Sequence, residues 1–285
     1  MPIRSLTSKT NPIIRTIRLV ADQSRRAPQD LVLAEGTRAL AEALDAKLEI
    51  EAVLLSEQFD MSVRNQVLLE EILRSSMSVY RAPDAVFRHL SAVQAPQGIL
   101  ALVRIPVIPL EEVILPDRPL ILCACAIQDP GNLGTLIRTA DAAGASLVCS
   151  LSGTVSARNP KTVRASAGAL FRLPVVEQIA APDFLDYCAR RSISLLSSSA
   201  RGATTYFETD LARPCALLLG NEGSGIDETI WAGVPCVCIP MAPGVESLNV
   251  AAAGAILLFE ALRQRTMRQR KLNRKDHTDL EKKPS

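Results

Sequence analysis

Residues 236–254 read CVCIPMAPGVESLNVAAAG and change character three times within one short stretch. The apolar residues 236–239 predict a buried strand, and Pro240 and Pro243 prevent that strand from continuing. From Leu248 onward the stretch is rich in Ala and Leu, which is typical of a helix. A strand, a tight loop and a helix start therefore meet here.

Polar side chains occur only where the loop meets the helix, at Glu246, Ser247 and Asn249. The free N–H groups of a helix start can bind a ligand there. The alternative is that Ser247 only caps the helix that follows. This stretch alone favours the cap.

Two other stretches have the same build. In each, an apolar strand leads into a polar loop: the strands are 120–127 and 216–219, and the loops are QDPGN at 128–132 and GNEGSG at 220–225. A helix at 133–143 follows the first loop. Three such strand ends are what an α/β domain arranges around a crevice at the carboxyl edge of its sheet.

The segments IQDPGNLGTLIRTADAAG, LLLGNEGSGI and IPMAPGVESLNVAAAG resemble, in order and spacing, the three motifs of the SpoU/TrmH family of RNA 2′-O-ribose methyltransferases. A fourth segment, RNPKTVRASAGALFR at 158–172, also resembles that family. The resemblance is close over 120–262. Four matched segments in sequence are far more specific than any one of them.

The resemblance implies an α/β fold with a knotted (trefoil), Rossmann-like parallel-sheet methyltransferase domain, preceded by a small α/β ribosomal-protein-like domain. In such a knot the C-terminal segment passes through a loop, which general topology rules exclude. Residues 26–38 and 95–103 resemble the substrate-binding domain of part of the family, and four prolines between 105 and 119 predict a stiff connection. We expect an RNA substrate-binding domain, a linker, the methyltransferase domain and a basic, disordered tail at 1–105, 106–119, 120–270 and 271–285.

The hydrophobic pattern predicts the elements of both domains. In the N-terminal domain we expect a basic amphipathic helix within 5–26, strands at 30–35, 50–55, 77–80 and 98–104, and helices at 36–44 and 65–75. In the C-terminal domain we expect further strands at 146–151, 175–176, 193–197 and 236–239, and helices at 159–169, 183–191 and 250–262.

The resemblance also assigns site residues. The catalytic candidates are Asn132, Arg138, Glu222, Ser247 and Asn249. S-adenosylmethionine is expected to be held, largely by backbone groups, at Leu219, Gly220, Asn221, Gly223, Ile239, Pro240, Met241 and Leu248. Methylation of a ribose hydroxyl needs its oxygen deprotonated and in line with a sulfonium methyl, which requires neither a metal nor a catalytic cysteine.

Arg138 occupies the position of the family's catalytic arginine. An arginine stays protonated at neutral pH, so we expect Arg138 to stabilise the developing alkoxide while a phosphate or water accepts the proton. The alternative is a structural ion pair between Arg138 and Asp141 or Glu222. Asn132, which follows Pro-Gly, has an alternative role as a helix cap.

Two features of the loops allow an interpretation other than a typical member of this family. The glycines of residues 220–225 suggest a dinucleotide loop, and hence an NAD-dependent oxidoreductase, but their spacing and late position differ from the true fingerprint. Gly244 lies one place later than the corresponding glycine of the family. Because the loop keeps its length, this departure concerns local loop shape.

Charge is distributed unevenly along the chain. Residues 1–38 carry a net charge of +4, residues 263–285 carry +6, and the remainder carries −8. Basic ends suit a polyanion such as RNA, although a solvated face and a disordered tail would have the same composition. The expected RNA-binding residues are Arg15, Arg18, Arg26, Arg38, Lys161 and Arg164.

The chain has seven cysteines, none in C-x-x-C spacing, and only two histidines, so we expect no metal site. We interpret the cysteines as reduced core residues, with a redox role for Cys236 and Cys238 as the alternative. No apolar run is long enough for a membrane span, and the N-terminus lacks a signal-peptide pattern. We therefore expect a cytoplasmic protein without membrane partners.

The leading hypothesis is a homodimeric, S-adenosylmethionine-dependent enzyme that methylates a ribose 2′-hydroxyl in structured RNA, with 23S rRNA as the expected substrate. Transfer RNA is the alternative substrate, and a non-catalytic knotted RNA-binding protein is the alternative class. Loops and shape select the nucleotide, so the sequence does not identify it.

Overall fold

The computed structural model describes residues 3–6, 10–60, 62–75, 77–199, 202, 204–221, 225–226 and 231–281, with the backbone alone for residues 64 and 272–281. The chain forms two compact units. Unit 1 comprises Met1–Ile108 and Ser156–Arg172, and unit 2 comprises Pro109–Val155 and Leu173–Ser285. Compared with the boundaries expected from the sequence, the segment 156–172 belongs with the N-terminal residues.

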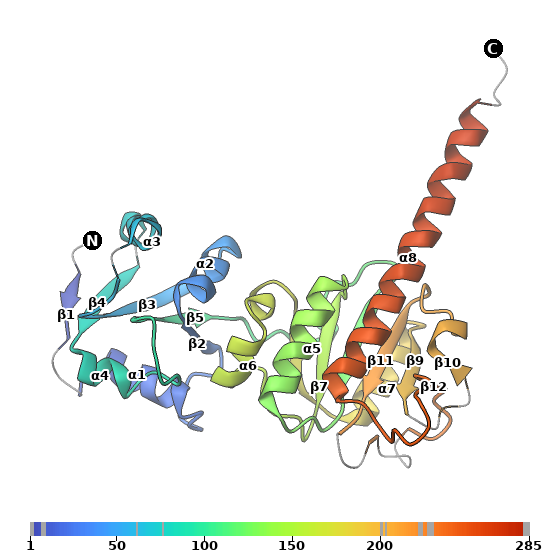
Figure 1. The fold of residues 1–285 in the computed structure, drawn as a ribbon, viewed down its shortest axis with the longest axis horizontal. Helices are drawn as coiled ribbons and strands as arrows, with labels where there is room; N and C mark the ends of the chain where they lie inside the picture. The colour runs from blue at the N-terminus through green and yellow to red at the C-terminus, as the bar shows by residue number, and fades with distance from the viewer. Residues whose placement is uncertain are drawn as a thin grey trace. The chain divides into compact units, whose positions relative to one another are not determined.

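Unit 1 is built on a five-stranded sheet in the order β1-β4-β3-β5-β2 (Figure 1). Its strands are β1 (Arg4–Ser5), β2 (Leu31–Glu35), β3 (Glu49–Ser56), β4 (Ser78–Ala82) and β5 (Ile99–Arg104). β5 runs antiparallel to β2 and β3, whereas β4 runs parallel to β1 and β3. The predicted strands of this unit are therefore present, and β1 is an addition that the sequence did not indicate.

The helices of unit 1 are α1 (Pro12–Ala21), α2 (Thr37–Asp45), α3 (Val63–Arg74), α4 (Asp84–Arg88) and α6 (Pro160–Ala165). α1 and α4 cover one face of the sheet, where Ile14, Ile17 and Phe87 pack against strand residues. α1 starts at Pro12 because the Asn11 side chain accepts a hydrogen bond from the Ile13 N–H at 2.9 Å. The helix expected within 5–26 is accordingly shorter.

Two helical segments differ from the prediction. The helix expected at 159–169 ends at Ala165, because Ala167 and Gly168 have φ of 49° and 89° and so leave the right-handed helical region. The five-residue helix α4 was not predicted. An element of little more than one turn is too short to show a periodic pattern.

Unit 2 contains a seven-stranded sheet in the order β10-β12-β9-β11-β6-β7-β8, in which all neighbouring strands are parallel. The strands are β6 (Leu120–Ala124), β7 (Leu147–Leu151), β8 (Val175–Ile179), β9 (Ser194–Ser198), β10 (Thr204–Thr205), β11 (Cys215–Leu219) and β12 (Cys236–Cys238). The expected parallel α/β architecture is confirmed. The threading of the C-terminal segment through a knot stays a prediction.

Helices cover both faces of this sheet. α5 (Pro130–Ala142) and α8 (Val250–Glu281) lie side by side on one face, and α7 (Ala181–Arg190) covers the other (Figure 1). Phe184 and Tyr187 of α7 are fully buried against the strands. Because the strands are parallel, the polar loops that follow β6, β11 and β12 all leave the same edge of the sheet.

Gly254 lets α8 approach the sheet closely. A Cβ atom at this position would lie 2.4 Å from Leu136 Cδ2 of α5 and 2.7 Å from Leu219 Cδ1 of β11. Leu136 and Leu219 are buried, so the core offers them little space to move away. The first turns of α8 are thus held against both α5 and β11.

α8 continues to Glu281, although the sequence predicted a tail from residue 271. Residues 263–281 contain neither Gly nor Pro, so nothing in them stops a helix. The second half extends away from the sheet of its unit (Figure 1). Arg265 attaches α8 to the segments before β6 and β11, at the point where the helix extends beyond the sheet. Its guanidinium donates to the carbonyl oxygens of Arg118, Pro119, Leu211 and Arg213.

We predict that Gly254→Ala lowers the free energy of unfolding by about 1–3 kcal/mol, because the added methyl group overpacks the contact with Leu136 and Leu219. Helix propensity alone would change stability in the opposite direction, by about 1 kcal/mol. Urea denaturation measures the difference. A Gly254→Ala/Leu136→Val double variant should recover part of the loss, and a single variant more stable than wild type would contradict the packing argument.

Candidate active site

The candidate site lies at the carboxyl edge of the sheet of unit 2. β6 and β11 are adjacent there, with Ala124 opposite Leu219, and the Cys125 N–H donates to the Leu219 carbonyl at 2.8 Å. The chain that leads to the QDPGN loop therefore leaves the sheet beside the end of β11. Neighbouring strands whose connections diverge form the crevice in which parallel α/β sheets bind ligands.

A hydrogen bond joins the first and third motifs. Asn249 Nδ2 donates to Asn132 Oδ1 at 3.0 Å, although the two residues are 117 positions apart. Asn132 lies in the first turn of α5 and Asn249 immediately precedes α8. The contact between α5 and α8 therefore brings two of the predicted catalytic residues together.

The helix caps differ from the alternatives that the sequence left open. Asp129 caps α5 by accepting from the Asn132 N–H at 2.9 Å, and Asn249 caps α8 by accepting from the Ala251 N–H at 2.9 Å. Asn132 and Ser247 are thus not the capping residues. The Asp-Pro sequence at 129–130, a cap residue followed by proline in the first helical position, was the signal that could have identified the cap of α5.

Side-chain amides connect the first motif loop to the second motif and to the loop after β7. Asn221 Nδ2 donates to the Ala126 carbonyl oxygen at 2.9 Å, and Gln128 Nε2 donates to the Gly153 carbonyl oxygen. Ala126 has a φ of 56°, which is uncommon for a residue other than glycine. Ala126 and Gln128 were not predicted as site residues, because a backbone conformation leaves no signal in the sequence.

The glycine-rich loop after β11 closes by backbone contact. The N–H groups of Asn221 and Gly225 each donate to the carbonyl oxygen of the other at 2.9 Å. A Cβ atom on Gly220 would lie 2.4 Å from the Gly225 carbonyl carbon, so only glycine fits there. Gly220 and Gly225 thus bring backbone without side chains together after β11, as a site that binds a ligand through main-chain groups requires.

Arg138 is exposed on α5, and among the side chains that the structure describes it forms no ion pair. The alternative of an Arg138–Asp141 pair is therefore not observed.

Ser247 and Leu248 are also exposed, in the loop before α8. Ile239 and Met241 are half-buried after β12, and Pro240 between them is exposed. Leu219 is buried in β11, and the predicted site residues Glu222 and Gly223 lie outside the described residues.

The predicted RNA-binding residues belong to unit 1. Arg15 and Arg18 are exposed on α1, and Arg26, Arg38 and Lys161 are also exposed. Arg164 is half-buried, and its Nη1 lies 3.8 Å from Glu35 Oε2. Five of the six are therefore accessible to a polyanion, while Arg164 also faces a carboxylate of its own unit.

The thiols between the sheet and α7 are unreactive. Burial raises the pKa of Cys123 and of Cys149 well above the ordinary value, and raises the pKa of Cys188 to about 12. These thiols are protonated at neutral pH and therefore poor nucleophiles. Within the described part of the chain, no group of three His, Cys, Asp or Glu side chains could hold a metal ion.

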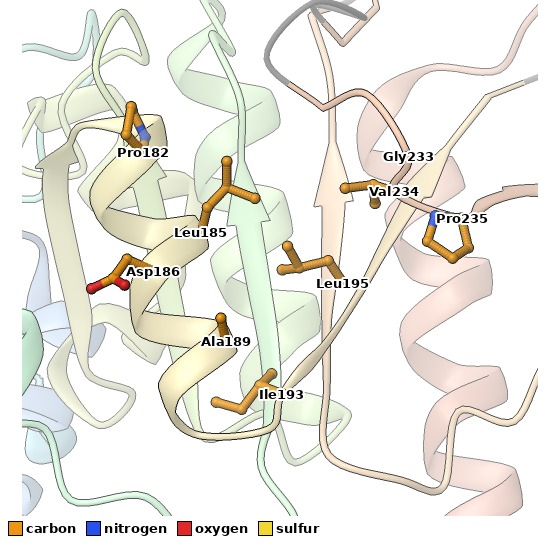
Figure 2. A pocket seen from close by; sticks show the side chains of 9 residues that line it. All are labelled: Pro182, Leu185, Asp186, Ala189, Ile193, Leu195, Gly233, Val234 and Pro235. Carbon is orange, nitrogen blue, oxygen red and sulfur yellow. The ribbon is translucent and has the colours of Figure 1, made fainter.

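A cavity of about 640 Å³ opens on the α7 face, between α7, β9 and residues 233–235 (Figure 2). Its lining is apolar except for Asp186, which forms an ion pair with Arg190 at 2.8 Å. None of the predicted site residues lines it. It is therefore distinct from the candidate site.

No helix within the described ranges is long and apolar enough to cross a membrane.

Family models match both parts of the chain. The SpoU rRNA Methylase family matches residues 119–259, and the MRM3-like substrate binding domain matches residues 11–101. The chain is 30% identical to the 23S rRNA (guanosine(2553)-2′-O)-methyltransferase RlmP of Bacillus subtilis over 258 residues, which cover 90% of this chain and 98% of the relative. It is also 30% identical to the 23S rRNA (uridine(2479)-2′-O)-methyltransferase of Streptomyces viridochromogenes, covering 92% and 93% of the two chains.

Solved structures agree with these matches. The AdoMet-bound rRNA methyltransferase from Sinorhizobium meliloti superposes with a TM-score of 0.79 at 29% identity, covering 92% of this chain and 98% of the other. The SpoU methyltransferase AviRb from Streptomyces viridochromogenes, in complex with AdoMet, superposes with a TM-score of 0.80 at 28% identity, covering 90% and 98%. Together with the motifs that meet at the carboxyl edge of the sheet, these similarities establish that the chain belongs to the SpoU rRNA methylase family.

Proposed function

We propose that this protein methylates the 2′-hydroxyl of a ribose in ribosomal RNA, with 23S rRNA as the substrate. The hydrogen bond between Asn249 and Asn132 carries the proposal, because it places two predicted catalytic residues of separate motifs at one point of the sheet edge. The relatives named as 23S rRNA 2′-O-methyltransferases support both the reaction and the substrate. Mapping ribose methylation in 23S rRNA with and without the gene tests it.

The methyl donor in this proposal is S-adenosylmethionine, which supplies an electrophilic sulfonium methyl group when bound. The backbone near Gly220, where a side chain would collide with Gly225, fits a ligand that is bound through main-chain groups. The residues that would hold it are Leu219, Gly220, Asn221, Ile239, Pro240, Met241 and Leu248 from the second and third motif loops. Gly223, assigned by resemblance, completes this set.

Arg138 acts on the reacting oxygen. Its guanidinium carries a permanent positive charge, so it stabilises the alkoxide that forms as the 2′-hydroxyl loses its proton to a phosphate oxygen or a water molecule. Asn132 and Asn249 orient the ribose through amide groups that already share a hydrogen bond. Ser247 and Glu222 complete the catalytic set that the family resemblance assigns.

The RNA is bound through phosphate contacts by unit 1. The exposed Arg15, Arg18, Arg26 and Arg38 all lie in this unit, and all four fall within the match to the MRM3-like substrate binding domain. Such contacts position a nucleic acid without reading its sequence. The basic second half of α8 adds positive charge to unit 2. Seven free cysteines suit a reducing compartment, and we place the protein in the cytoplasm.

The protein acts as a homodimer in this proposal. The family resemblance implies pairing through terminal helices, for which the apolar face of residues 251–262 is the sequence candidate. Much of that face, including Ala251, Leu257 and Leu258, is buried in the core of its own chain. Phe259 remains 48% exposed on the same helix. An exposed aromatic side chain beside small residues supports pairing through the outer side of α8.

We predict that Arg138→Ala reduces methylation of 23S rRNA at least about 100-fold while S-adenosylhomocysteine binding stays near normal, because the lost charge acts only on the reacting oxygen. Complementation of a gene deletion, read by mapping 2′-O-methyl groups, measures activity, and calorimetry measures cofactor affinity. Arg74→Ala, on an exposed helix of unit 1, is the control. Loss of folding or of cofactor affinity in Arg138→Ala would instead indicate a structural role.

We predict that Asn221→Asp weakens S-adenosylhomocysteine binding about ten-fold, because a carboxylate cannot donate to the Ala126 carbonyl oxygen and the loop loses its anchor. Asn65→Asp is the matched control, since Asn65 Nδ2 also donates to a carbonyl, that of Asp60, at 2.9 Å but in unit 1. Calorimetric titration compares the two. Equal affinities for wild type and Asn221→Asp would rule out this anchoring role.

We predict that the wild-type protein sediments as a dimer at micromolar concentration and that Phe259→Asp shifts it toward the monomer, because a charge at the interface must be desolvated. Analytical ultracentrifugation measures both. The circular dichroism spectrum should be unchanged, since Phe259 lies outside the core. A wild-type monomer would refute the dimer, and a variant that stays dimeric would place the interface elsewhere.

A further inference from the structure

Segment 156–172 connects the candidate site to the substrate-binding unit. It lies within the match to the SpoU family, yet it packs as part of unit 1, whereas the residues on either side of it belong to unit 2. Directly before it, the Val155 N–H donates to the Ile127 carbonyl at 2.8 Å and Thr154 Oγ1 donates to the Ala124 carbonyl at 3.1 Å. The segment therefore emerges from the loops of the candidate site.

Glu42 of α2 contacts this segment at two places. Gly168 has a φ of 89°, and a Cβ atom there would lie 2.7 Å from Glu42 Cγ and 2.8 Å from Glu42 Cβ. The aliphatic part of Glu42 thus lies directly against the Gly168 turn. Its carboxylate forms an ion pair with Arg172, at the end of the same segment.

Glu35, at the end of β2, is a second anchor. Its side chain is only 5% exposed, and its carboxylate accepts hydrogen bonds from Ser91 Oγ and from the Ala92 N–H. Arg164 of α6 lies 3.8 Å from the same carboxylate. A buried carboxylate requires such partners, because an unpaired charge in the interior is costly.

A third arginine completes the attachment. Arg158 Nη1 donates to the Ile105 carbonyl oxygen at 3.1 Å, directly after β5. α6 also packs against β2, with Thr162, Val163 and Ser166 buried. Three arginines of one segment therefore bind groups of the substrate-binding unit, and none of these contacts involves a predicted catalytic residue.

We propose that Glu35 and Glu42 form a carboxylate clamp that holds segment 156–172 and so positions RNA bound by unit 1 for reaction at the site of unit 2. Arg164 and Arg172 are positioning residues in this clamp. Arg164, which was also predicted to bind RNA, pairs with Glu35. The inference rests on the proposed function, because it concerns how RNA reaches the reactive centre.

The clamp acts through effective concentration. When a substrate is bound by one unit and reacts at another, the stiffness of the connection determines how often the reacting groups meet. The chain passes between the units three times, at 108–109, 155–156 and 172–173. The last two passages are the two ends of segment 156–172, so the clamp restrains both of them. Without the clamp, segment 156–172 would be held to unit 1 only by Arg158 and the buried face of α6, so its two passages would constrain the RNA less.

The test compares Arg172→Ala, Glu42→Gln and the charge-swapped Glu42→Arg/Arg172→Glu protein with wild type, on 23S rRNA purified from cells that lack the gene. We expect kcat to fall about ten-fold or more in the single variants, because small misplacement of reacting groups has large effects on rate. The dissociation constants for RNA and for S-adenosylhomocysteine should stay within about two-fold, and the swapped pair should recover most of kcat.

Arg74→Ala is the matched control, because Arg74 pairs with Glu70 on the surface of α3 and is 78% exposed. Its kcat should equal that of wild type. An unchanged kcat in both Arg172→Ala and Glu42→Gln would overturn the clamp. Equal losses of kcat and of both affinities, without recovery in the swapped pair, would also overturn it, because they would indicate general unfolding.

Hydrogen exchange separates failure of the clamp from failure of the proposed function. Glu42→Gln and Gly168→Ala should speed exchange of the amides of 156–172 while those of 120–151 stay protected. Gly144→Ala is the control for Gly168→Ala, since Gly144 also has a positive φ, of 71°, but nothing lies within 4 Å of an added Cβ. Unchanged exchange over 156–172 would overturn the clamp even if wild type proved inactive on 23S rRNA.

Discussion

The close approach of α8 to α5 and β11 at Gly254 is the contact on which the site depends. Both neighbouring leucines are buried, so the packing leaves room for a hydrogen atom and for nothing larger. This approach brings the start of α8 to the start of α5, where Asn249 bonds to Asn132. At the other end of the sheet, Arg265 holds the same helix to four carbonyl groups. The helix is therefore fixed at both edges of the sheet.

The site is made of amides, glycines and backbone groups. Asn221 and Asn249 each donate one hydrogen bond to the segment 126–132, and Ala126 in that segment adopts a left-handed conformation. The buried thiols nearby stay protonated because desolvation disfavours the thiolate. Such an arrangement suits a reaction that needs orientation and charge stabilisation at an oxygen and no covalent intermediate with the protein. Arg138, exposed on α5, is the residue proposed to supply the permanent positive charge.

The two units share more than a linker. Segment 156–172 matches the methyltransferase family by sequence but packs with the substrate-binding unit, where Glu35 and Glu42 receive its arginines. In the proposed function, unit 1 binds RNA phosphates and unit 2 binds the methyl donor. This arrangement lets the surface that selects RNA vary without disturbing the crevice in which methylation is proposed to occur.

The sequence by itself determined the alternation of strands and helices in both units and the position of the polar loops, because apolar runs, prolines and glycines act locally. It also identified the family from four short motifs. Only the tertiary structure decided that Asn249, and not Ser247, caps α8, and that Asn132 is its partner 117 residues away. The same holds for α4, for the early end of α6 and for the place of 156–172 in unit 1. These features depend on backbone conformation and on packing between distant segments, for which periodicity carries no signal.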